Sequence, residues 1–152
     1  MPVRIKGKVY KTVIRPVLLY GAETWALKRR EEEMLERTEM RMLRWILGVS
    51  LKDRKRNDFI RNKIGITCIT DKIRESRLRW YGHVQRSKED GCIKRILNAE
   101  IYGRRSRGRQ RKRWLDAVQQ DLKKLCLTPE TAANRSEWRR RTRVADPSPA
   151  RD

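Results

Sequence analysis

Arginine is the residue type best placed to do chemistry in this chain, and it gathers first in a glycine-containing run between Tyr102 and Trp114. The run reads GRRSRGRQRKR and contains no acidic residue. Guanidinium groups form strong, charge-assisted hydrogen bonds with phosphate, and a helix expected to begin near Arg113 would add the positive end of its dipole. The run therefore predicts a phosphate-binding loop, with nuclear import or a merely solvated loop as the alternative. Its candidate residues are Arg104, Arg105, Arg107, Arg109, Arg111, Lys112 and Arg113.

A second cluster lies in RESRLRWYGHVQR, residues 74–86, where aromatic side chains stand among the arginines. Such a mixture on a helix can stack bases and hold phosphates of RNA or single-stranded DNA. The alternative is that both aromatic residues face the core. We favour that alternative for Trp80 and leave Tyr81 open. The candidate residues of this cluster are Arg74, Arg77, Arg79, Tyr81 and Arg86.

A third cluster, Arg139 to Arg141 with Arg143, follows Trp138, and here a solvated helix face is as good an interpretation as a binding face.

Catalysis and metal binding find little support in the residue pattern. His83 is the only histidine and has no neighbouring nucleophile in sequence, so a packed or capping role is favoured. Asp and Glu residues are scattered and form no pair suited to a catalytic metal. Cys68, Cys92 and Cys126 lack the short spacings of structural zinc sites, which favours buried, inert thiols. We expect no enzyme activity, no cofactor and no metal in this chain.

Charge is the dominant property of the composition. The 152 residues include 40 Lys and Arg against 19 Asp and Glu, a net charge of +21. An excess of this size indicates a polyanionic partner, most commonly nucleic acid, with an anionic membrane surface as the weaker alternative. No stretch approaches the roughly 20 apolar residues of a membrane span. An odd number of widely spaced cysteines favours a reducing compartment.

Helical periodicity dominates the elements that would position these clusters. We expect helices over 3–20 with a kink at Pro16, over 31–49 ending at Gly48, and over 57–64 ending at Gly65. Further helices are expected over 70–86 with Thr70 as N-cap, over 91–101, around the stripe from Leu115 to Leu125, and from Pro129 to before Pro147. The sequence thus predicts an all-α fold of six or seven short helices with a thin core and a basic loop.

Three segments in this order resemble the C-terminal part of non-LTR retrotransposon polyproteins, most closely RTE/BovB-like endonuclease/reverse transcriptases. They are KGKVYKTVIRPVLLYGAETW (6–25), RLRWYGHVQR (77–86) and GRRSRGRQRKRWLDAV (103–118). The resemblance implies a thumb-like end at 1–25, a helical segment at 26–101, a basic loop at 102–113, C-terminal helices at 114–146 and a tail at 147–152. The catalytic signatures of such polyproteins, those of an RNA-directed DNA polymerase and an endonuclease, do not occur in this chain.

The expected function is therefore a nucleic-acid-binding fragment of a retrotransposon reverse transcriptase. It would grip template RNA or target DNA, in the nucleus after a cytoplasmic stage, without catalysis of its own. Its expected partners are the RNA or DNA backbone and the palm and fingers of a reverse transcriptase, with no membrane. The alternatives are a helical adaptor that docks on the polymerase through residues 31–49, its basic loop serving nuclear import, or a non-functional relic of an element.

Overall fold

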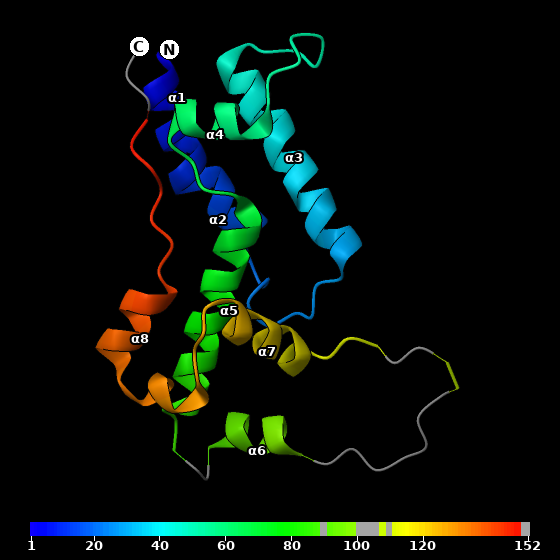
Figure 1. Cartoon of the computed structure of the whole chain (residues 1–152), viewed down its shortest axis with the longest axis vertical. Helices are drawn as coiled ribbons and strands as arrows, with labels where there is room; N and C mark the ends of the chain where they lie inside the picture. Colours follow the sequence, from blue (N-terminus) through cyan, green and yellow to red (C-terminus); the bar gives the residue numbers. More distant parts are fainter. Residues whose placement is uncertain (89–90, 100–106, 109–110, 150–152) are drawn as a thin grey trace.

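The fold is organised around one long helix, α5 (Ile69–Gln85), which lies at the centre of an elongated molecule (Figure 1). The computed structural model describes residues 1–88, 91–99, 107–108 and 111–149. Over these residues the chain is all-α, without strands, and the continuous α1–α2 helix together with α3 to α8 makes seven helices. The predicted fold class is confirmed. None of the helices in this part of the chain has the length and apolar character needed to cross a membrane.

The N-terminal helix contains a π-helical turn just before Pro16. It consists of α1 (Val3–Val9), a π-helical turn (Tyr10–Ile14) and α2 (Arg15–Leu18). Pro16 has no N–H to donate to the preceding turn, and the widened turn accommodates this gap without ending the helix. Tyr10 is fully buried, whereas Val13 and Val17 are exposed.

Two helices pack beside it to form the N-terminal cluster. α3 (Arg29–Leu47) ends at Gly48 and α4 (Asn57–Ile64) ends at Gly65, and both glycines adopt the left-handed conformation expected of helix C-caps. The cluster consists of the buried residues Tyr10, Met40, Leu43, Ile46, Ile60, Ile64 and Ile66.

The second half of α5 packs against the C-terminal helices to form a separate C-terminal cluster. α7 (Trp114–Lys124) and α8 (Arg135–Thr142) cross α5 and are joined through a 3₁₀ turn (Pro129–Ala133). The last predicted helix is therefore divided, because the Asn134 side chain accepts the N–H groups of Ser136 and Glu137 and starts a new helix. The cluster consists of Leu78, Tyr81, Val118, Leu122, Leu127, Ala132 and Trp138.

Two smaller features complete the fold. α6 (Cys92–Asn98) lies at the end of the molecule beyond α5, and a third small cluster joins Ala22, Leu27, Ile69 and Ile73. The start of α5 differs from the prediction, since Cys68 and not Thr70 is its N-cap residue.

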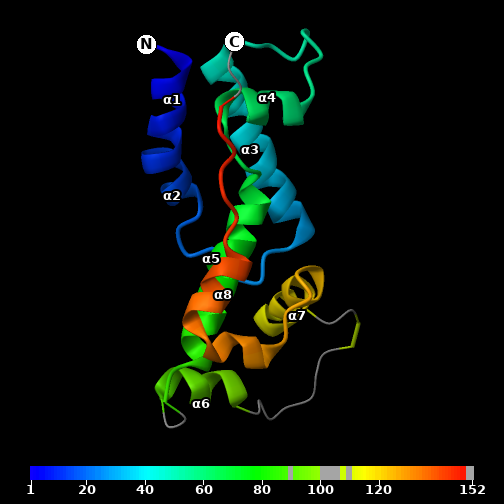
Figure 2. The same ribbon diagram turned by 60° about the vertical axis from the view of Figure 1, so that its left-hand side comes forward.

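The C-terminal segment runs back along α5 towards the N-terminus, as both ribbon views show (Figures 1 and 2). Asp146 anchors this segment. It accepts two hydrogen bonds from Arg15, at 2.8 and 2.6 Å, and a third from the Thr67 N–H at 3.0 Å. Burial of Asp146 opposes its ionisation, but these hydrogen bonds outweigh that effect and lower the pKa of its carboxyl well below the usual range.

Candidate nucleic-acid interface

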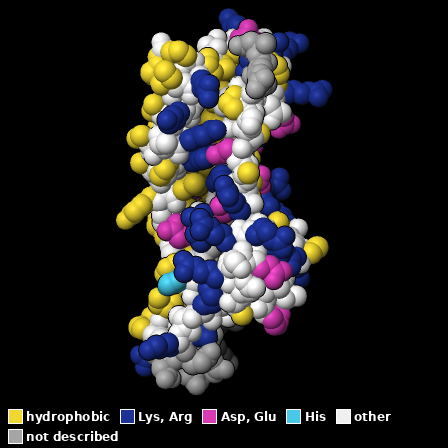
Figure 3. Space-filling model, turned by 90° about the vertical axis from the view of Figure 1, so that its left-hand side faces the viewer, with side chains coloured by type: hydrophobic (Ala, Val, Ile, Leu, Met, Phe, Trp, Pro, Cys, Tyr) yellow, Lys and Arg dark blue, Asp and Glu magenta, His cyan; other side chains and the backbone are white. Residues whose placement is uncertain are grey.

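A concave surface with many basic residues lies between α2, α5 and α8, and we call it the basic groove. It has a volume of about 1430 Å³ and is open to solvent. Figure 3 shows Lys and Arg side chains crowded around the single His on this side of the molecule. Only Glu23 and Glu75 bring negative charge to its lining. Its basic residues are Lys11, Arg15, Lys72, Arg79, Arg86, Arg135, Arg139 and Arg143.

One wall of the basic groove is a column of arginines that starts on α8. Arg135, Arg139 and Arg143 are spaced four residues apart, so they stand on one side of the helix and span about 12 Å. All three are exposed, and among the described residues no carboxylate forms an ion pair with them. Trp138, which also contributes to the groove lining, is buried and donates its indole N–H to the Leu78 carbonyl at 2.9 Å. This anchor fixes which side of α8 faces the groove.

The other wall is the exposed face of α5. Trp80 and His83 line it, one helical turn apart, with their rings stacked at a centroid distance of 5.4 Å and an interplanar angle of 24°. Arg79 is largely exposed and pairs with Glu75 at 2.9 Å. Arg86 donates a hydrogen bond of 2.6 Å to the Ala132 carbonyl. Aromatic and cationic groups are thus combined on this wall.

On the floor of the basic groove, carboxylates neutralise the charge of the neighbouring cations. The Glu75 carboxylate accepts hydrogen bonds from the Lys72 and Arg79 side chains, both at 2.9 Å, and from the backbone N–H of Val144 at 3.3 Å. Burial opposes ionisation of Glu75, but these donors outweigh it and lower the pKa of its carboxyl. Arg15 is held by Asp146 in the same way, which raises the pKa of the Arg15 guanidinium. The charge left for a ligand is therefore that of the walls, above all the α8 column.

Two predicted site residues of the second cluster are core residues, and their assignment to a binding site is wrong. Arg77 is 3% exposed and donates to Asp121 of α7 at 2.7 Å. Tyr81 is 6% exposed and packs between the rings of Trp114 and Trp138, with burial raising the pKa of its phenol. A helix presents one side to the core, and that side contains positions 77 and 81, four residues apart.

The other members of the second cluster remain near the surface. Arg79 and Arg86 line the basic groove, whereas Arg74 is engaged by Asp71, one turn earlier on α5. Trp80, which sequence periodicity assigned to the core, belongs to none of the three apolar clusters and lines the groove instead. His83 is exposed and stacked, not packed in the interior.

The basic run is described only in part. Arg104, Arg105 and Arg109 lie outside the described residues. Arg107, Arg111 and Arg113 are exposed, and Lys112 donates to the Leu27 carbonyl at 3.3 Å.

The helix after the run begins where the sequence predicts, with Arg113 as the N-cap residue of α7. The Asp116 carboxylate accepts a hydrogen bond from the Arg113 N–H at 2.8 Å. One backbone N–H of the predicted phosphate-binding loop is thus already bound to a carboxylate of the chain itself.

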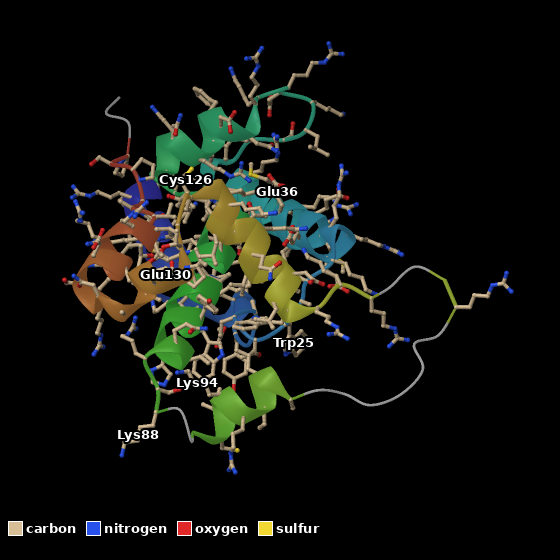
Figure 4. All side chains as sticks on the ribbon, turned by 60° about the horizontal axis from the view of Figure 1, so that its bottom comes forward. Trp25, Glu36, Lys88, Lys94, Cys126 and Glu130 are labelled. Carbon is tan, nitrogen blue, oxygen red and sulfur yellow. The ribbon has the colours of Figure 1, made fainter. Side chains whose placement is uncertain are left out.

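Metal-ligating residues do not gather in the part of the chain that the structure describes, where no group of three or more His, Cys, Asp or Glu could hold an ion. Cys68 is partly buried, whereas Cys92 and Cys126 are exposed, which corrects the expectation of buried thiols. Figure 4 shows Cys126 beside the end of α7, away from α6 and its Cys92.

The residues that sequence reasoning missed are the stacked Trp80–His83 pair and four basic residues of the groove lining, Lys11, Arg15, Lys72 and Arg135. A signal was available for the pair: positions 80 and 83 lie one turn apart, with Arg79 and Arg86 on the same helix. Arg135 and Lys11 lie at opposite ends of the sequence, and only the fold brings them into one groove.

Comparison with known proteins gives one informative similarity. The chain is 24% identical over 147 residues to an uncharacterised transposon-derived protein of Caenorhabditis elegans, and the match covers 89% of this chain. The chain spans about half the length of that relative, 53%. No protein-family model matches, and no solved structure matches. The similarity indicates an origin in a transposable element.

Proposed function

We propose that this chain is the nucleic-acid-binding C-terminal fragment of a reverse transcriptase from a non-LTR, RTE/BovB-like element. It grips the backbone of template RNA or target DNA in the basic groove and performs no catalysis itself. Two observations support the parentage: the three ordered segments that resemble such polyproteins, and the similarity to a transposon-derived protein. A nuclear location with a cytoplasmic stage is part of the same proposal.

The observation that carries the binding proposal is the unpaired arginine column of α8. Some arginines elsewhere on the described surface have carboxylate partners, as Arg29 has Glu33 and Arg74 has Asp71. Arg135, Arg139 and Arg143 have none among the described residues, although they stand on one side of a helix beside further cations. Mutual repulsion in such an array is relieved by a polyanion, which also releases its own counterions on binding.

The test is the salt dependence of binding to single-stranded RNA. Each phosphate contact contributes a slope of about −0.7 to log K against log[salt], so replacing all three arginines by Ser is expected to flatten the slope by about 2. The matched control replaces Arg30, Arg41 and Lys52, three exposed cations outside the groove, by Ser. Filter binding at four salt concentrations compares the two triple variants at equal net charge. An equal loss in both would mean that only total charge matters and would contradict a binding groove.

A second candidate function, docking onto the palm and fingers of the polymerase, is favoured by an exposed apolar stripe on the N-terminal helix. In helix α3, Leu43 and Ile46 already pack into the N-terminal cluster. The stripe consists of Ile5, Val9, Val13, Val17 and Tyr20, which are 41–91% exposed. Replacing Val9, Val13 and Val17 by Glu is expected to abolish co-purification with a co-expressed palm and fingers segment. The same variant is expected to leave RNA affinity nearly unchanged. Loss of both properties together would contradict separate surfaces.

A further inference from the structure

The aromatic pair on the α5 wall of the basic groove has no structural task in the apolar core. The C-terminal cluster is filled by Tyr81 and Trp138, and Trp80 is part of no cluster. An indole left at the surface of a groove, with an exposed imidazole stacked on it at 5.4 Å, presents flat ring surface to whatever enters the groove.

The position of the pair relative to the cations is specific. Trp80 and His83 lie on α5, while Arg139 and Arg143 line the groove from the α8 side. A ligand held by both walls must therefore combine a flat, stackable group with negative charges. Nucleotides have this combination: every base has a π-face, and stacking on an aromatic side chain tolerates any sequence.

We propose that Trp80 and His83 form a stacking site for an unpaired base of single-stranded nucleic acid, whose phosphates contact the α8 arginine column. This inference rests on the proposed function and adds the kind of nucleic acid that the groove selects. In a duplex, neighbouring base pairs cover both faces of each base, so only an unpaired base can stack on the pair. Single-stranded RNA and single-stranded DNA share this chemistry, and the choice between them is left to the arms of the experiment.

The experiment measures binding of four labelled probes of equal length by fluorescence anisotropy at fixed salt. They are oligo(U), oligo(dT), an abasic oligonucleotide that keeps its phosphates, and a duplex. The variants are Trp80→Ala, Trp80→Phe and His83→Ala. The matched control is Trp25→Ala, because Trp25 is 66% exposed, does not line the groove and lies on the α7 side of the molecule (Figure 4).

The expected result is a loss confined to probes with unpaired bases. Trp80→Ala is expected to weaken oligo(U) and oligo(dT) binding about ten-fold and to leave the abasic and duplex probes unchanged. Trp80→Phe is expected to retain most of the affinity, His83→Ala to lose a smaller factor, and Trp25→Ala to lose none. A larger loss on oligo(U) than on oligo(dT) would assign the site to RNA, and the reverse to DNA.

The failures of this inference and of the proposed function are distinguishable. If wild-type protein binds the abasic probe as tightly as oligo(U), stacking is refuted while the backbone groove stands. If none of the probes binds, the proposed function itself fails. If Trp80→Ala weakens binding of all probes equally and also loses helicity by circular dichroism, the variant is misfolded and His83→Ala becomes the test. If His83→Ala then shows no loss confined to oligo(U) and oligo(dT), the stacking site is refuted.

Discussion

Both halves of the molecule bury an arginine against a carboxylate, but the C-terminal half in addition lines the basic groove with arginines of α8. In the N-terminal cluster, Arg61 is drawn inside, where it pairs with Glu36 at 2.8 Å and with the fully buried Glu39 at 3.4 Å. Glu39 also accepts the Tyr10 hydroxyl at 2.9 Å. In the C-terminal half, apolar and aromatic residues surround the buried Arg77–Asp121 pair, and Arg135, Arg139 and Arg143 are exposed without carboxylate partners among the described residues.

The difference has a clear electrostatic consequence. Burial raises the pKa of Glu39 despite its hydrogen-bond donors, and burial together with Glu39 raises the pKa of Tyr10. Keeping this charged network in the interior therefore costs free energy of folding. The C-terminal half also buries one ion pair, Arg77–Asp121, but keeps the arginines of α8 at the surface. Binding capacity is therefore expected in the C-terminal half, and the N-terminal half contributes stability and the exposed stripe of α1 and α2.

The largest expected effect breaks the C-terminal cluster. Trp138→Ala removes a side chain that is 2% exposed, together with its hydrogen bond to Leu78, and is expected to cost about 3–5 kcal/mol in the free energy of unfolding. Urea denaturation measures the change. Trp45→Ala, at a position 76% exposed, is the control and is expected to cost under about 0.5 kcal/mol. Similar costs for the two variants would contradict a core role for Trp138.

The next effect tests the corrected role of Arg77. Arg77→Met leaves Asp121, 5% exposed, without its partner, and is expected to cost about 3 kcal/mol in stability. Because Arg77 does not line the groove, the salt slope of RNA binding by the folded fraction is expected to stay unchanged. A flattened slope with full stability would restore Arg77 to the binding site.

A closely related loss is expected from Gly82, which the sequence gives no reason to single out. A Cβ at this position would collide with the indole of Trp138, whereas Gly21 has open space around it. Gly82→Ala is therefore expected to destabilise the protein by about 1–3 kcal/mol, because the core cannot yield without moving Trp138. Thermal unfolding followed by circular dichroism measures this, and an unchanged midpoint would contradict the close packing of α5 on α8.

A smaller and pH-dependent effect comes from the C-terminal segment. Asp146→Asn weakens its charge-assisted bonds to Arg15 and is expected to cost about 1–3 kcal/mol at neutral pH. The folded pKa of Asp146 is lowered, so its contribution is present above the unfolded value near 4 and is lost as pH falls below it. The stability difference between wild type and variant should therefore shrink only in acid. A constant difference down to low pH would show that Asp146 acts without its charge.

The smallest expected effect on stability comes from the basic run. One variant replaces five basic residues of the run by Ser: Arg107, Arg109, Arg111, Lys112 and Arg113. It leaves the apolar stripe of α7 untouched and is expected to change the free energy of unfolding by less than about 0.5 kcal/mol. If the run binds phosphates alongside the basic groove, the salt slope on RNA flattens by about two to four units. If it serves only nuclear import, the slope stays and nuclear accumulation of the variant is lost on imaging.

The helices and many of their boundaries could be predicted from the sequence, because periodicity and capping are local properties. Gly48 and Gly65 end α3 and α4 as predicted, and α7 begins after Arg113. The net charge also follows from composition alone, and with it the expectation of a polyanionic partner.

Which arginines are available to a ligand depends on how the helices pack, and this could not be predicted from the sequence. Arg77 and Arg79 are two residues apart in one basic motif, yet one pairs with Asp121 in the core and the other lines the groove. Burial depends on which side of α5 meets α7 and α8, and this packing is set by contacts between residues far apart in sequence, such as Trp138 on Leu78. Local patterns carry no information about such partners. The sequence therefore favoured a core position for Trp80 and left Tyr81 open, whereas in the fold Tyr81 is buried and Trp80 lines the groove.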